Sequence, residues 1–211
     1  MYTKLFELEP TRRDAILNAA LKEFALKGYD EASTNVIAKE AGISKALMFH
    51  YVGSKENLFF LVYDYFTDIM DKEYVALMNV KVKDIFERLR QSYLLQLELV
   101  RKYPWIFELN KLSAASNPDE IKKGIAKRAT AKLSSCNIFD GIDESKFRTG
   151  LDIEKCKQFI LWSNIGFTNQ ILESVRDLEF DHLDDDAIIL EMDDNLQELK
   201  KVFYEQEGEK G

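Results

Sequence analysis

The side chains best suited to chemistry fall in the stretch SKALMFHYVGSK, residues 44–55. A lysine ammonium donates to phosphate oxygens or guanine, imidazole and phenol groups donate to phosphates, and small apolar groups contact thymine methyls. Met48 and Val52 are spaced i, i+4 on a short helix and are expected to point inwards. The other side of that helix then predicts contact with the major groove of DNA. It consists of Lys45, Ala46, Leu47, Phe49, His50 and Tyr51.

The segment in front of this helix has the composition of a tight turn between two short helices. Ala41 is small enough for a helix crossing, and Gly42 tolerates φ > 0. Ile43 is expected to enter the core, and Ser44 can accept from free N–H groups at the start of the next helix. This arrangement indicates a helix-turn-helix. An ordinary αα-hairpin, with its aromatic side chains against a neighbouring helix, is the alternative.

The distribution of charge allows DNA binding, although the net charge is -8. Residues 1–60 contain eight Lys or Arg and eight Asp or Glu, so this part is neutral. The remainder contains 21 basic and 29 acidic residues and carries the whole deficit. A neutral head still binds DNA if its cations share one face.

Apolar residues recur with a period near 3.6 along almost the whole chain, and no segment alternates like a strand. The sequence therefore predicts an all-α protein, with a three-helix head over residues 1–53 and a larger helical domain over residues 54–211. About nine helices are expected in all. Three lie in the head, after Thr11, Thr34 and Ser44, and the others cover residues 54–78, 82–102, 104–113, 117–135, 152–177 and 184–205.

Residues 11–60 resemble the tetracycline-repressor (TetR) family of bacterial transcriptional regulators. The resemblance rests on fixed spacings of Thr34, Ile37-Ala38, Ala41-Gly42-Ile43-Ser44, Phe49-His50-Tyr51, Ser54-Lys55-Glu56 and Leu58. Thr34, Ser44 and Lys55 are expected beside the outward side of the second short helix, in contact with DNA. The family usually has Gly at Ala46, often a small polar residue at Leu47, and Tyr at Phe49. Because of these departures, the operator sequence is not predicted.

The resemblance implies that the larger domain binds a small molecule. An apolar cavity with a few polar anchors is the usual form of such a site. We expect an apolar or amphipathic organic effector, neutral or cationic because the body is acidic, and no cofactor. The predicted lining consists of Phe86, Tyr93, Trp105, Phe107, Asn110 and Trp162.

The resemblance also implies a homodimer, and the last two helices offer candidate faces. On the first of them the face consists of Phe159, Ser163, Gly166, Phe167 and Gln170. On the second, a stripe at helical spacing consists of Ile188, Met192, Leu196, Leu199 and Phe203. The alternative is that both helices complete the core of the monomer.

The leading hypothesis is a ligand-responsive repressor that binds a palindromic operator as a dimer. Two alternatives remain: a TetR-like interaction module without DNA binding, and a small helical enzyme. Catalytic motifs are absent from the sequence, and the acidic run 181–186 lacks the pattern of a calcium loop, so neither catalysis nor a metal is expected. Cys136 and Cys156 show no disulfide spacing, and no apolar run or signal peptide is present, which predicts a cytoplasmic protein without membrane contact.

Overall fold

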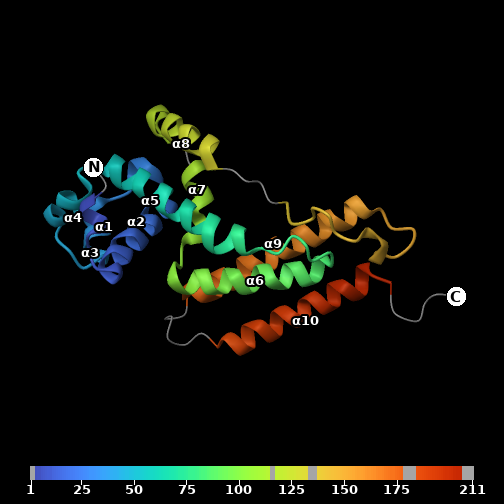
Figure 1. The fold of residues 1–211 in the computed structure, drawn as a ribbon. Coiled ribbons are helices and arrows are strands. Elements are labelled where there is room, and N and C mark those ends of the chain that lie inside the picture. Colours follow the sequence, from blue (N-terminus) through green and yellow to red (C-terminus); the bar gives the residue numbers. More distant parts are fainter. Residues whose placement is uncertain (1–2, 115–116, 133–136, 178–183, 206–211) are drawn as a thin grey trace. The chain divides into compact units, whose positions relative to one another are not determined.

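The computed structural model describes residues 3–114, 117–132, 137–177 and 184–205 (Figure 1). Within these ranges the chain is helical and contains no β-strand, apart from an antiparallel bridge between Phe147 and Tyr204. The all-α prediction is confirmed. The chain divides into two compact units, Met1–Lys72 with Tyr103–Ser134, and Glu73–Lys102 with Ser135–Gly211.

The first unit holds the head, and it extends beyond residue 53, where the sequence predicts the domain boundary. Phe24 and Phe59 meet edge to face in its core, with ring centroids 5.1 Å apart, and both are buried. Its elements are α1 (Thr3–Phe6), α2 (Pro10–Glu31), α3 (Thr34–Glu40), α4 (Lys45–Val52), α5 (Lys55–Ile69), the 3-10 helix η3 (Ile106–Glu108), α7 (Leu109–Ala114) and α8 (Asp119–Lys132).

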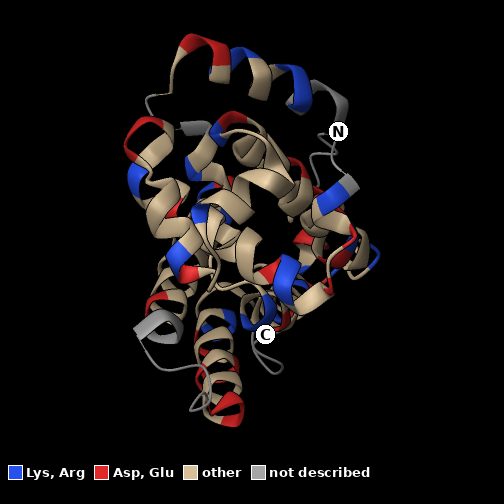
Figure 2. Ribbon diagram, turned by 90° about the vertical axis from the view of Figure 1, so that its left-hand side faces the viewer, with Lys and Arg blue, Asp and Glu red and all other residues tan. Residues whose placement is uncertain are grey.

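Helix α8 packs closely against α5. A Cβ added to Gly124 would collide with the ring of Phe60, so the glycine allows this approach. The Arg128 guanidinium lies 4.0 Å from the centre of the same ring, and its Nε is 3.1 Å from a carboxylate oxygen of Asp64. Figure 2 shows acidic residues in the first turn of α8 and basic residues along the rest, the order that the helix dipole favours.

The second unit is built on three long helices that lie alongside one another (Figure 1). Its apolar core includes Ile85, Leu89, Ile160 and Met192, all at most 2% exposed. Its elements are the 3-10 helix η2 (Val75–Leu77), α6 (Ile85–Lys102), the 3-10 helix η4 (Glu144–Lys146), α9 (Ile153–Asp177) and α10 (Asp185–Phe203). A π-helical segment, η1 (Met70–Tyr74), follows α5 and crosses the boundary between the units.

Arg88 on α6 has a fully buried side chain, which connects two loops to this helix by hydrogen bonds. Its guanidinium donates to four main-chain carbonyl oxygens, those of Val80, Val82, Ile138 and Asp140. A buried charge is costly unless it is well hydrogen-bonded, and these carbonyls supply the bonds.

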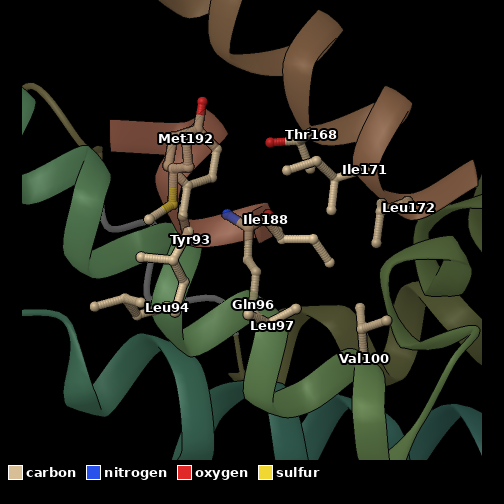
Figure 3. A pocket seen from close by; sticks show the side chains of 11 residues that line it. Tyr93, Leu94, Gln96, Leu97, Val100, Thr168, Ile171, Leu172, Ile188 and Met192 are labelled. Carbon is tan, nitrogen blue, oxygen red and sulfur yellow. The ribbon is translucent and has the colours of Figure 1, made fainter. Parts of the chain in front are cut away.

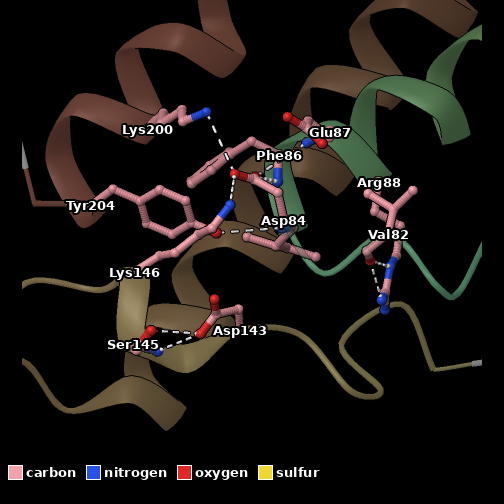
Figure 4. A network of polar contacts seen from close by, with 11 residues as sticks. Val82, Asp84, Phe86, Glu87, Arg88, Asp143, Ser145, Lys146, Lys200 and Tyr204 are labelled. Carbon is pink, nitrogen blue, oxygen red and sulfur yellow. Dashed lines mark hydrogen bonds and ion pairs between the residues drawn. The ribbon is translucent and has the colours of Figure 1, made fainter.

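Asp84 forms a second tie at the start of α6 (Figure 4). Its carboxylate is 4% exposed, and one oxygen accepts from Phe86 N at 3.0 Å. The other lies 2.8 Å from Lys146 Nζ and 3.5 Å from Lys200 Nζ. Burial raises the pKa of Asp84, but the two lysines and the main-chain bond outweigh it and hold the pKa below its usual value. Asp84 therefore joins η4 and the end of α10 to α6.

The predicted helices match the observed ones closely, with three differences. The helix expected over 54–78 is α-helical only to Ile69, and η1 and η2 replace its last part. Helix α2 begins at Pro10 without a side-chain cap from Thr11, whereas α3 begins at Thr34 as predicted, with Ser33 as its cap. Helix α1 is not predicted, because four residues are too few for a periodic pattern to show.

Candidate DNA-binding and effector-binding sites

The turn between α3 and α4 has the geometry that its sequence predicts. Gly42 adopts φ 67°, in the left-handed region that favours glycine. Ile43 N donates to Ala38 O at 3.0 Å, which closes the turn. Ser44 Oγ accepts from Leu47 N at 3.1 Å and caps α4. The two short helices are therefore fixed at a defined angle by local hydrogen bonds.

The inward side of α4 is also as predicted, with Met48 fully buried and Val52 6% exposed. Ile43 is half-buried rather than fully in the core. Seven of the residues predicted to contact DNA lie on α4 or at its cap. Four of them are exposed and three are half-buried. The exposed ones are Ser44, Lys45, Ala46 and His50, and the half-buried ones are Leu47, Phe49 and Tyr51.

The aromatic side chains of α4 lie close to its polar groups. Lys45 Nζ lies 5.9 Å from the ring centre of Phe49. The rings of His50 and Tyr51 meet edge to face at 5.7 Å. Lys4 Nζ, from α1, lies 3.4 Å from His50 Nε2 and adds a cation that the sequence analysis did not predict. No pattern in the sequence connected the two, because Lys4 lies 46 positions before His50 and precedes the motif.

Thr34 and Lys55 occupy the edges of this surface. Thr34 is half-buried in the first turn of α3. Lys55 is half-buried at the start of α5, where Ser54 Oγ accepts from Asn57 N at 3.0 Å. Lys55 Nζ donates to Asp30 O at 3.0 Å and lies 5.0 Å from the ring centre of Tyr29. Lys55 is therefore held by the head itself in this structure.

The second unit contains a pocket among α6, α9 and α10 (Figure 3). The space open to the centre of a water-sized sphere is about 30 Å³, roughly two waters, so a larger molecule enters only if the helices separate. Most of the lining is aliphatic. It consists of Tyr93, Leu94, Gln96, Leu97, Val100, Thr168, Ile171, Leu172, Ile188, Ile189 and Met192.

Two hydroxyl groups and one amide are the polar features of this lining. Tyr93 is 5% exposed, its ring meets that of Phe167 edge to face at 5.5 Å, and its hydroxyl has no hydrogen-bond partner among the described residues. The Thr168 hydroxyl likewise lacks a partner among them. Burial raises the pKa of Tyr93, and the nearby Thr168 only partly offsets the rise. Gln96 Nε2 donates to Ser92 Oγ at 2.9 Å.

Of the six residues predicted to line an effector cavity, only Tyr93 lines this pocket. Phe86 is buried against Tyr204 in the core, with ring centroids 4.9 Å apart. Trp162 is 55% exposed on α9. The other three, Trp105, Phe107 and Asn110, belong to the first unit. The lining of this pocket is mostly aliphatic and comes from three separate helices, so it differs from the aromatic set that the sequence predicts.

The predicted dimer residues divide between the surface and the core. On α9, Phe159, Gly166 and Gln170 are exposed and Ser163 is half-buried, whereas Phe167 packs on Tyr93. The predicted stripe on α10 faces the monomer core, which corrects its assignment to the interface. In that stripe Met192, Leu196 and Phe203 are at most 9% exposed, Leu199 packs against the same core, and Ile188 lines the pocket.

The remaining features considered in the sequence are a metal site, the two cysteines and membrane contact. Within the described ranges, no three His, Cys, Asp or Glu side chains are grouped so as to hold a metal ion. Asp184, in the acidic run, caps α10 by accepting from Ala187 N at 3.1 Å. Cys156 is buried, and Cys136 lies outside the described residues. Among the helices described, none has the length and apolar character needed to span a membrane.

Comparison with known proteins gives the class of the head. Residues 16–62 match the sequence model of the bacterial regulatory proteins of the tetR family. The chain is 41% identical over 68 residues to the uncharacterized HTH-type transcriptional regulator YuxN of Bacillus subtilis, which is 32% of this chain and 22% of that protein. It is 45% identical over 51 residues to the HTH-type regulator BetI of Agrobacterium fabrum, which is 24% of this chain and 25% of that protein. The chain thus spans about a quarter of the length of these relatives.

Solved structures share the whole fold. A TetR family regulator from Chloroflexus aurantiacus superposes with a TM-score of 0.58 at 16% identity, over 96% of this chain and 97% of that one. The ketosteroid regulator KstR2 of Mycobacterium tuberculosis gives 0.55 at 19% identity, over 94% and 98%. AibR, solved with isovaleryl coenzyme A and operator DNA, gives 0.51 at 22% identity, over 86% and 95%. At these identities the likeness shows the fold alone.

The capped turn and α4 therefore form a DNA-binding helix-turn-helix of the kind found in transcriptional regulators. Residues 16–62, which include this motif, are similar to the DNA-binding region of the tetR family of bacterial regulatory proteins.

Proposed function

We propose that this protein is a ligand-responsive transcriptional repressor, which binds a palindromic operator as a homodimer in the cytoplasm and is released by a small organic effector. The observation that carries the proposal is the capped helix α4, whose exposed side bears Lys45, Ala46 and His50 within a helix-turn-helix. The similarity of the head to tetR family regulators supports transcriptional regulation as the activity. The surface chemistry of α4 supports the mode of binding.

On DNA, α4 enters the major groove with its capped end towards the bases. Lys45 reaches a phosphate or a guanine, and Ala46 and Leu47 contact thymine methyl groups. His50 and Tyr51 donate to phosphate oxygens. Lys4 lies beside His50 and adds a cation to the same surface. Lys55 contacts a phosphate once its bond to Asp30 O is given up.

We propose that the dimer interface lies on α9 alone, because the apolar stripe of α10 packs against the core of the monomer. Phe159, Trp162 and Ile165 are 52%, 55% and 47% exposed, and Gly166 is exposed beside them. Exposed apolar groups that gather on one helix face mark association sites. A twofold dimer places two copies of α4 about 34 Å apart, one helical turn of DNA, or a multiple of it.

The pocket of the second unit is the proposed effector site, and Gln96 is the proposed link to the head. Gln96 Nε2 donates to Ser92 Oγ and lies 3.4 Å from Tyr74 Oη, and Tyr74 Oη is 2.6 Å from Ser92 Oγ. Tyr74 follows the first unit directly in the sequence, at the end of η1. A ligand that moves α6 at Gln96 therefore shifts the segment that leads back to α5.

The ligand must prefer the state that does not bind DNA. A molecule with equal affinity for both states changes nothing, whereas a hundredfold preference is worth about 2.7 kcal/mol. AibR, with its acyl-thioester ligand and operator DNA, shows that this fold supports both kinds of complex in another protein.

The test is a titration of the full-length protein with the DNA upstream of its own gene and with a shuffled fragment of equal length. The proposal predicts tighter binding to the upstream DNA and an affinity that falls steeply with salt, because phosphate contacts release counterions. A helical interaction module without DNA binding would show no salt-dependent binding to either fragment. That result would overturn the proposal.

A further inference from the structure

Two buried hydroxyl groups stand out in the aliphatic pocket of the second unit. Tyr93 comes from α6 and is 5% exposed, and Thr168 comes from α9 (Figure 3). Both oxygens are buried and have no hydrogen-bond partner among the residues that the structure describes. Native proteins leave few buried polar groups unpaired, so each such group calls for an explanation.

The third polar group of the pocket does not need a ligand. Gln96 already donates to Ser92 Oγ at 2.9 Å, in the chain of contacts that ends at Tyr74. Among the described residues, the two hydroxyls are therefore the fully buried polar groups of this lining that have no hydrogen-bond partner. Both side chains line the same pocket, and the Thr168 hydroxyl is close enough to lower the pKa of Tyr93, although neither oxygen meets the distance and angle criteria of a hydrogen bond.

The rest of the lining limits the charge and shape of a ligand. No Lys, Arg, His, Asp or Glu is among the lining residues. A carboxylate or ammonium bound there would be buried without a counter-ion, which is strongly unfavourable. Apart from Tyr93, the apolar lining residues are aliphatic rather than aromatic, and the open space is small, so the lining suits a short aliphatic chain better than a ring system.

We propose that this pocket binds an aliphatic molecule with one uncharged oxygen function, such as a ketone, ester, amide or alcohol, whose oxygen is hydrogen-bonded by Tyr93 Oη and Thr168 Oγ1. The inference rests on the proposed function, in which this pocket is the effector site. Because burial raises the pKa of Tyr93, its phenol stays protonated at neutral pH and remains a donor.

The probes are 2-hexanone, its hydrocarbon isostere 2-methyl-1-hexene, and hexanoate, each titrated into the full-length protein and followed by the methyl NMR signals of Ile, Leu and Val. We expect 2-hexanone and 2-methyl-1-hexene to bind and hexanoate to bind at least about tenfold more weakly than the ketone, because its charge has no partner. Tyr93→Phe and Thr168→Val should each weaken ketone binding about five- to tenfold, the usual effect of one neutral hydrogen bond. Neither change should weaken binding of the hydrocarbon.

The matched control is Asn169→Ala, an exposed change next to Thr168 on α9, which should leave all affinities unchanged. A second measurement does not depend on any ligand. If the hydroxyls are unpaired in the free protein, Tyr93→Phe and Thr168→Val should not lower its melting temperature. A lower melting temperature for both would show that the hydroxyls have structural partners, and would overturn the inference.

The inference also fails if 2-hexanone does not bind, or if it binds regardless of the two hydroxyls. Its failure is distinct from failure of the proposed function, which is measured by DNA affinity with and without 2-hexanone. Ketone binding that depends on both hydroxyls but leaves DNA affinity unchanged would support the inference and contradict the effector role of the pocket.

Discussion

The surface of α4 and the pocket of the second unit differ in the kinds of group that they present to a partner. On α4 the groups come from one short helix, stand in solvent and include a cation, which suits a charged polymer with many phosphates. In the pocket they come from three helices, are mostly aliphatic, and include two buried hydroxyls without a hydrogen-bond partner among the described residues. A change in one helix alters the first surface alone, whereas the pocket depends on the packing of the whole unit.

The largest effect is expected from the buried guanidinium that supports the pocket's unit. Arg88→Met leaves four carbonyl oxygens without their donor, and we expect the free energy of unfolding to fall by about 3 kcal/mol or more. Urea unfolding measures it. The matched control is Arg90→Met, two residues along α6, where the exposed pair with Asp193 contributes at most about 1 kcal/mol. If both variants lost the same free energy of unfolding, the hydrogen bonds from Arg88 to the four carbonyl oxygens would not be a main source of stability.

The proposed dimer face predicts the next largest effect. Trp162 is 55% exposed, so Trp162→Ala should change the monomer little but raise the dimer dissociation constant about 30-fold, about 2 kcal/mol, because buried tryptophans dominate interfaces. Analytical ultracentrifugation measures the constant. Leu26→Ala, at a position 54% exposed on α2, is the control and should leave it unchanged. A dimer that is insensitive to Trp162 would place the interface elsewhere.

Asp84 predicts how the stability of the second unit depends on pH. Its folded-state pKa is held below the usual value of about 3.9, so its ionised form stabilises the fold above that pH, and the contribution is lost as the pH falls through the lower folded-state pKa. Asp84→Asn should cost about 1–3 kcal/mol at pH 7, because Lys146 loses its buried partner. Urea unfolding between pH 7 and pH 2 should show a smaller acid-induced loss in the variant than in the parent. Parallel pH profiles would contradict this role.

The features of the head were predictable from sequence because they are local. Ser44 and Ser54 cap the helices that directly follow them, and Gly42 turns the chain where it stands. The pocket was not predictable in the same way. Periodicity identified α6, α9 and α10, and it identified the apolar stripe of α10, but not which neighbour that stripe faces. Because charged residues are rarely fully buried, no sequence signal marked Arg88 as internal.

We propose above that the exposed side of α4 binds DNA through the cation of Lys45. The most direct test compares Lys45→Ala with Lys201→Ala, which removes the same charge from α10, in titrations with the upstream DNA across a range of salt concentrations. If Lys45 contacts a phosphate, Lys45→Ala should weaken binding about five- to tenfold, and the slope of log affinity against log salt should flatten by about 0.9. Lys201→Ala should change neither quantity. Equal behaviour of the two variants would contradict the assignment of α4 as the DNA-binding surface.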